Sequence, residues 1–230
     1  MYIELAEVLV CPVCLSRHEE DTLQGLVAVV GGLQDRKVIS GWLGCPACEA
    51  RYPIADGAVS FAPPPSEARD RSGGGSSTTD SPPGSFEQQA AAALLVAALL
   101  SLDEAAGYVL LGQGLGPMAE ELSGLAPKSE IVALQGRQEG PVRPPTAGVS
   151  RLLDTAEGSL PLRTASMIAA AILGAREDAI AETARVLRVA GRLVVLGFSP
   201  AREEAILSLL RAAGLEPIVV DPRAIVARRV

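Results

Sequence analysis

The sequence has little positive charge and no long apolar run. The first shortage disfavours nucleic acid as a partner, and the second argues against a membrane-spanning helix. Its 230 residues hold 20 Lys and Arg against 27 Asp and Glu, which gives a net charge of -7 at pH 7. Because a surplus of acid repels phosphate backbones, we expect nucleic acid to be a disfavoured partner. The longest purely apolar run, Ala90–Leu100, is shorter than the roughly 20 residues of a membrane-spanning helix.

The first ten residues also lack the basic side chains that open a secretory signal. They read MYIELAEVLV and carry acids where such a signal has Lys or Arg. We therefore expect a cytoplasmic protein with no membrane span of its own.

All four cysteines lie in the first fifth of the chain, as Cys11-Pro-Val-Cys14 and Cys45-Pro-Ala-Cys48. Two Cys-x-x-Cys knuckles bring four thiolates to one tetrahedral ion, which predicts a closed structural zinc site. A rubredoxin-like iron site and redox-active or disulfide-forming pairs are the alternatives, although no thioredoxin-like strand and helix surround either pair. The single histidine, His18, is expected to be a solvated side chain and not a ligand.

The insert between the two knuckles predicts a small sheet. Thirty residues separate Cys14 from Cys45, more than the spacing of about 15–20 found in common zinc fingers. Its apolar runs, Leu26–Val30 and Val38–Leu43, are separated by glycine and polar turn residues, as in a pair of strands.

The knuckles and the residues after them resemble the zinc-ribbon family of methyltransferase activators, the tRNA methyltransferase activator subunits. The resemblance covers about residues 1–63 and rests on LVCPVC and CPACEARYPIADGAVSFAP, in which Tyr52-Pro53-Ile54 and Asp56-Gly57 follow the second knuckle. It implies a ribbon that docks on a methyltransferase, stabilises and solubilises it, and performs no chemistry.

A stretch rich in Pro, Gly, Ser and Thr, between Pro63 and Ser85, predicts a domain boundary. Such a composition cannot offset its ordering entropy by burial, so we expect a flexible tether. A long surface loop within one domain is the alternative. The prediction is a zinc-ribbon domain at 1–63, a linker at 64–86 and a second domain at 87–230.

The second domain alternates between helical and strand-like segments, which predicts an α/β fold with a mainly parallel sheet flanked by helices. A buried helix is expected at 86–102, a helix that begins near Pro117, one that ends with Gly191 at its C′ position, and one at Arg202–Ala213. The expected strands are Tyr108–Leu111, Ile131–Leu134, Val149–Leu153, Ser166–Leu173, Leu193–Leu196, Pro217–Val220 and Ala224–Arg228. Three prolines and three glycines in GRQEGPVRPPTAG predict that one crossover helix is lost or shortened.

Three motifs in order resemble the class I S-adenosylmethionine-dependent methyltransferase fold over about residues 87–230. VLLGQGLG resembles its glycine loop, DTAEGSLPL its third-strand segment, and ETARVLRVAGRLVVLGF its fourth helix and fifth strand. The resemblance implies a Rossmann-like domain. It places the cofactor residues at Gly112, Gly114, Gly116, Gln135 and Asp154.

Most of the carboxylates that this family uses to hold S-adenosylmethionine are replaced. Leu110, Gln135 and Ile168 stand where the resemblance places acids for the amino acid end, the ribose and the region of the methyl group. Only Asp154, at the position near adenine, is kept. Each lost contact costs about 1–3 kcal/mol, so we predict a degenerate cofactor site. The glycines are then retained for the turn itself, and Asp154 is either a cofactor acid or a turn acid.

We predict no catalytic residue, because the chain has one histidine, no cysteine beyond residue 48 and no Asn-Pro-Pro-aromatic stretch to position an amine. The first hypothesis is a non-catalytic scaffold or accessory subunit of a protein complex. The second is an active S-adenosylmethionine-dependent methyltransferase that carries its activator ribbon in cis. The third is a cleft that holds another small apolar ligand.

Overall fold

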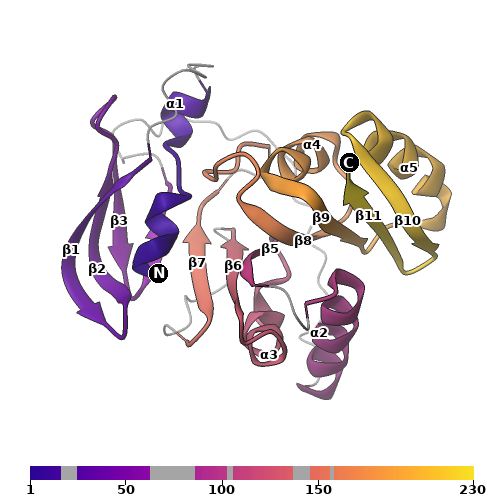
Figure 1. Ribbon diagram of the computed structural model, residues 1–230, viewed down its shortest axis with the longest axis horizontal. Helices are drawn as coiled ribbons and strands as arrows, with labels where there is room; N and C mark the ends of the chain where they lie inside the picture. Colours follow the sequence, from indigo (N-terminus) through magenta and orange to yellow (C-terminus); the bar gives the residue numbers. More distant parts are fainter. Residues whose placement is uncertain (17–24, 63–85, 103–105, 137–145, 156–157) are drawn as a thin grey trace.

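A computed structural model describes residues 1–16, 25–62, 86–102, 106–136, 146–155 and 158–230. In this part of the chain, eleven strands form one sheet in the order β1-β2-β3-β4-β7-β6-β5-β8-β9-β11-β10 (Figure 1). The strands are β1 (Val27–Gln34), β2 (Lys37–Gly44), β3 (Arg51–Ala55), β4 (Ala58–Ser60), β5 (Gly107–Leu111), β6 (Ser129–Gln135), β7 (Val149–Leu153), β8 (Met167–Leu173), β9 (Leu187–Leu196), β10 (Leu215–Asp221) and β11 (Ala224–Arg229).

The ribbon half consists of β1 to β4, which pair antiparallel in chain order. Asp35 and Arg36 join β1 to β2 with φ of 47° and 64°, the left-handed pair that a type I′ hairpin turn requires. The strands expected at Leu26–Val30 and Val38–Leu43 are thereby confirmed. Two short helices precede this hairpin, η1 (Ile3–Glu7) and α1 (Pro12–Ser16).

The α/β half has five parallel neighbours, β7-β6-β5-β8-β9. Next to them, β11 is antiparallel to β9, and β10 is antiparallel to β11 and so has the direction of the five parallel strands. In chain order these strands are third, second, first, fourth and fifth, which is the doubly wound arrangement. This confirms the α/β fold with a mainly parallel sheet flanked by helices, the architecture of class I methyltransferases.

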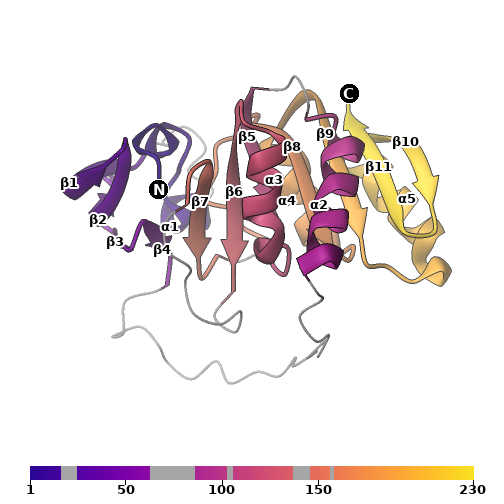
Figure 2. The ribbon, with the colours of Figure 1, turned by 90° about the horizontal axis from the view of Figure 1, so that it is seen from below.

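Helices cover both faces of this half (Figure 2). The helices are α2 (Phe86–Leu100), η4 (Gly116–Met118), α3 (Ala119–Leu125), α4 (Glu177–Val186), η5 (Pro200–Arg202) and α5 (Glu203–Ala212). One buried cluster joins α2 and α3 to the sheet, and another joins α4 and α5 to its opposite face. No helix in the described part of the chain is long and apolar enough to cross a membrane.

The ribbon and the α/β half share both sheet and core. Strand β4 pairs parallel with β7, so that Val59 lies beside Leu152, and Leu9 forms an isolated bridge with Leu162. The buried cluster that contains Leu43 of the ribbon also contains Leu152 and Ile180 of the α/β half. The domain boundaries at 63 and 87 flank residues outside the described ranges and stay a prediction.

Two expected elements differ from the structure. The helix expected to end at Gly191 ends at Val186, and Gly191 lies inside β9, where a Cβ would come within 3.0 Å of the Ile168 carbonyl oxygen. A close backbone approach therefore explains this glycine, and a helix cap does not. The helix expected to begin near Pro117 is confirmed, since Pro117 lies in the first turn of η4, which α3 follows directly. Helix α2 forms as expected but is buried on one side only, since Val96 is buried and Leu94 is 59% exposed.

Candidate metal centre and cofactor loop

Two chain turns position the four cysteines. Cys11 precedes α1 and Cys14 lies within it, with Pro12 as the first residue of the helix, where its missing N–H costs nothing. The backbone N–H of Leu15 donates to the Cys11 carbonyl at 2.9 Å. Cys45 follows β2, and its carbonyl accepts from the N–H of Glu49 at 3.0 Å, which closes the turn that contains the second pair.

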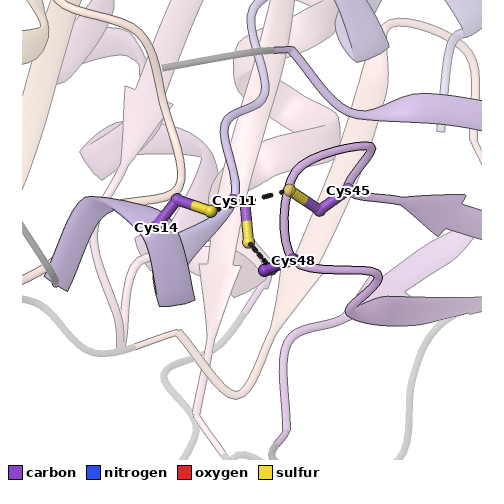
Figure 3. A group of neighbouring side chains, drawn as sticks. All are labelled: Cys11, Cys14, Cys45 and Cys48. Carbon is purple, nitrogen blue, oxygen red and sulfur yellow. Dashed lines mark hydrogen bonds between the residues drawn. The ribbon is translucent and has the colours of Figure 1, made fainter. Parts of the chain in front are cut away.

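The thiols converge on one point between these turns (Figure 3). All four sulfur atoms lie within 4.8 Å of one another; Cys11 and Cys48 are 3.5 Å apart, and Cys14 and Cys45 are 3.7 Å apart. Tetrahedral zinc with bonds of about 2.3 Å separates its sulfur ligands by about 3.8 Å. The donor set therefore fits a zinc ion, and its four thiolates would close the coordination sphere.

Tyr52 supports this centre from β3. Its hydroxyl lies 3.0 Å from Cys11 Sγ, and its ring packs on Phe61 with the centroids 4.9 Å apart. Burial, and then the hydrogen bond with Cys11, hold the pKa of Tyr52 well above its ordinary value. The phenol is thus kept protonated and able to donate to a thiolate, as outer-shell groups of metal sites do. Tyr52 belongs to the segment that resembles the activator family, but its spacing alone did not indicate this contact.

Burial also acts on the thiols themselves. It raises the pKa of Cys14, with hydrogen bonding to Cys48 as the next cause. A bound cation would favour the thiolate over the thiol, because its positive charge stabilises the form that a buried apolar site otherwise disfavours.

The predicted cofactor residues gather at one edge of the sheet. The glycine loop follows β5, Gln135 ends β6, and Asp154 follows β7. Asp154 donates its backbone N–H to the Gln135 carbonyl at 3.0 Å. This edge holds the carboxyl ends of the parallel strands, and the strand order reverses between β5 and β8, where doubly wound sheets bind ligands.

Neighbouring backbone and side chains account for two of the loop's glycines. The N–H of Gly112 donates to the Ala171 carbonyl at 2.8 Å, and a Cβ on Gly112 would lie 3.3 Å from Ile172 Cα. Gly114 has φ of +83°, and a Cβ there would lie 2.7 Å from Leu173 Cδ1. Gly114 therefore needs glycine for its backbone conformation, and a Cβ at Gly112 would press on the backbone of β8, whether or not a ligand binds.

Asp154 is engaged by the ribbon. Its Oδ2 accepts a hydrogen bond of 3.0 Å from Ser60 Oγ, at the end of β4. Next to it, the Gln113 amide donates to the Thr155 carbonyl at 2.8 Å and so joins the glycine loop to the segment after β7. Sequence reasoning missed Ser60 and Gln113, because the resemblance assigns a role to neither position, although both lie inside the segments that carry it. Ser60 reaches the site only through the β4–β7 pairing.

The position expected to hold the acid for the amino acid end of the cofactor is apolar here. Leu110 is fully buried and, with Leu134, Leu160 and Ile172, lines a cavity of about 10 Å³ beneath the loop, near the smallest volume that holds one water. The matching of Ile168 to the methyl-group region was wrong. Ile168 lies near the amino end of β8, where a Cβ on Gly107 would come within 2.7 Å of its side chain.

No family model matches the sequence, and no curated protein matches it significantly. Solved methyltransferase structures have a similar fold. A geranyl diphosphate methyltransferase with GPP and sinefungin is 14% identical over 61% of this chain and 77% of its own, with a TM-score of 0.48. The geranyl diphosphate C-methyltransferase of Streptomyces coelicolor, solved with S-adenosyl-L-homocysteine, is 13% identical over 68% and 90%, with a TM-score of 0.47.

The [4+2]-cyclase SpnF is 21% identical over 56% of this chain and 59% of its own, with a TM-score of 0.45. With identities below 25% and TM-scores below 0.5, these structures bear on the fold only. The strand order and directions given above carry the fold description.

Proposed function

We propose that this chain is a non-catalytic accessory subunit, in which a zinc ribbon of the methyltransferase-activator type supports a methyltransferase-like domain that has lost its cofactor. The observation that carries the proposal is the hydrogen bond between Ser60 and Asp154. Asp154 is the one acid kept among the expected cofactor contacts, and the ribbon engages it. The proposed role is to hold other proteins in a complex.

The absence of carboxylates at Leu110 and Gln135, where the resemblance places acids, supports the same proposal. A carboxylate accepts two hydroxyl hydrogen bonds at once, and neither the amide of Gln135 nor the alkyl chain of Leu110 replaces it. At about 1–3 kcal/mol for each contact, every loss weakens binding roughly 5- to 150-fold. Two such losses together weaken the binding of S-adenosylmethionine by roughly 25- to 20,000-fold.

The ribbon's place in the sheet supports a structural role for zinc. Activator ribbons dock on a separate methyltransferase, whereas here β4 pairs with β7 of the same chain. That pairing satisfies the backbone groups of a sheet edge that would otherwise be open to aggregation. Zinc would stabilise the ribbon and, through β4, the sheet beside it.

A second candidate function is an active S-adenosylmethionine-dependent methyltransferase with its activator in cis. One observation favours it: Thr155 Oγ1 is buried and has no hydrogen-bond partner among the described residues. Buried hydroxyls usually have a partner, and a ligand at the loop would supply one. Gly112, Gly114, Gly116, Gln135 and Asp154 would then surround the cofactor.

Calorimetric titration of the zinc-loaded protein with S-adenosylmethionine and S-adenosylhomocysteine separates the two functions. The accessory role predicts no heat of binding up to millimolar ligand in a folded protein. Binding of micromolar strength that Asp154→Asn weakens would overturn the loss of the cofactor and favour the second candidate. Circular dichroism of both proteins confirms that the comparison is between folded chains.

A further inference from the structure

Helix α2 presents a second apolar stripe to solvent. Ala93, Val96 and Leu100 lie buried against α3 and the sheet, while the opposite side of the helix is exposed. Leu94 is 59% exposed and Leu95 is 46% exposed. Ala91 and Ala98 are exposed on the same side, so the four residues follow the i, i+3, i+4, i+7 spacing of one helix face. We call them the α2 stripe.

The surroundings of the α2 stripe restrict what covers it. No charged residue occurs between Glu87 and Asp103, and a helix that is apolar all round is normally covered. Its 15 residues are too few to cross a bilayer. The acids that bound this apolar stretch in the sequence, Glu87, Asp103 and Glu104, are the wrong charge for anionic lipid headgroups, which attract helices rich in Lys and Arg.

The segment that precedes α2 in the sequence is too polar in composition to account for a cover over the α2 stripe. Residues 63–85 contain Pro, Gly, Ser, Thr and charged side chains, with Ala68 as the single aliphatic residue apart from proline. Such a segment lacks the apolar area that would remove two leucines from water. A protein surface is therefore the occupant that the chemistry fits.

The α2 stripe is complementary to itself. Read in either direction it is Ala-x-x-Leu-Leu-x-x-Ala, with its centre between Leu94 and Leu95. When two such helices cross antiparallel about a twofold axis at that centre, Leu94 of one copy meets Leu95 of the other. The alanines at both ends leave room for the helices to approach to the usual 8–10 Å. An isologous contact of this kind closes after two copies.

We propose that two copies of this chain dimerise about a twofold axis through the α2 stripe. Helix α2 lies beside α3, and α3 separates it from the ribbon strands β1 to β3 (Figure 2). The dimer stands apart from the accessory role, because the stripe contains neither a metal ligand nor a cofactor residue. It is formed whether or not the loop binds S-adenosylmethionine.

Sedimentation velocity of the zinc-loaded protein tests this surface. The wild type is expected to sediment as a dimer at micromolar concentration, and Leu94→Glu and Leu95→Lys as monomers. An equimolar mixture of these two variants is expected to form a dimer again, because the introduced carboxylate of one chain would face the introduced ammonium group of the other. Leu33→Glu is the matched control, since Leu33 is 57% exposed on β1, far from α2, and its replacement should leave the dimer intact.

Three results would overturn the proposal: a monomeric wild type, a dimer that Leu94→Glu leaves intact, or folded variants that stay monomeric when mixed. Circular dichroism establishes that each variant is folded. The mixture also distinguishes a specific twofold contact from loss of solubility, because only the twofold contact is restored by opposite charges.

Discussion

Cys45 shows how a single residue couples metal binding to folding. It is 4% exposed, and its sulfur lies 3.7 Å from that of Cys14, so its removal opens the tetrahedral site to three ligands. We expect Cys45→Ser to lose most of its bound zinc and several kcal/mol of stability, because metal binding is part of the folding free energy. Metal content by atomic absorption and thermal unfolding measure the two effects.

Chelation of the wild type is the control for this variant, since it removes the ion without changing a side chain. It should lower the unfolding temperature by a similar amount. If Cys45→Ser kept both its metal and its stability, the structural zinc assignment would be wrong.

Glu130 is expected to make the stability of the protein depend on pH. It lies at the amino end of β6, on the side of the sheet opposite the glycine loop. Its carboxylate, at the start of β6, accepts a hydrogen bond from Ser150 Oγ, with Lys37 and Glu4 among the nearby charges. Burial raises the pKa of Glu130 from 4.5 to about 7. The folded protein therefore binds more protons than the unfolded chain between these values, and the contribution of Glu130 to stability falls as the pH rises through 7.

Replacement by glutamine removes this titration. The stability of the wild type relative to Glu130→Gln should fall between pH 5 and pH 8, by on the order of 3 kcal/mol at about 1.4 kcal/mol per pKa unit. Urea unfolding at several pH values measures the difference. A constant difference across this range would show that Glu130 has an ordinary pKa.

At the scale of elements, the strands were the most predictable features. β7 and β11 were expected within a residue of their observed ends, because short apolar runs bounded by turn residues specify buried strands. The predicted end of α4 was wrong. The helical spacing of Ile180, Ala184 and Leu187 continues past Val186, but Leu187 already belongs to β9, where it pairs with Met167. Tertiary pairing overrode the local pattern there.

In the candidate sites too, features specified by nearby residues were predictable, and features formed by tertiary contacts were not. Spacing indicated the cysteine cluster, because each knuckle is local and only the knuckles had to meet. The Ser60–Asp154 hydrogen bond joins residues 94 positions apart, and no local pattern specifies it. Helix α2 was recognised as a helix, but its apolar composition does not say which stripe faces the sheet, so the exposure of Leu94 came from the structure alone.

The whole molecule is a sheet that runs without interruption from the ribbon into the α/β half. Besides the β4–β7 pairing, Lys37 of the ribbon donates to the carbonyls of Thr146 and Val149, and Val10 donates to that of Pro161 at 3.1 Å. Buried aliphatic side chains contribute about 1.5–3 kcal/mol each to such a shared core. The covalent connection between the halves should therefore be dispensable once the protein has folded.

Cleavage at a protease site inserted at Gly73–Gly75 tests that conclusion. We expect the two fragments to co-elute in size-exclusion chromatography and to retain the metal, because β4 and the common core hold them together. Chelation before cleavage should weaken the association, since it removes the ion that organises the ribbon. Fragments that separate in native buffer would mean that the ribbon is only tethered, and its surface would then be free to dock on a methyltransferase in trans.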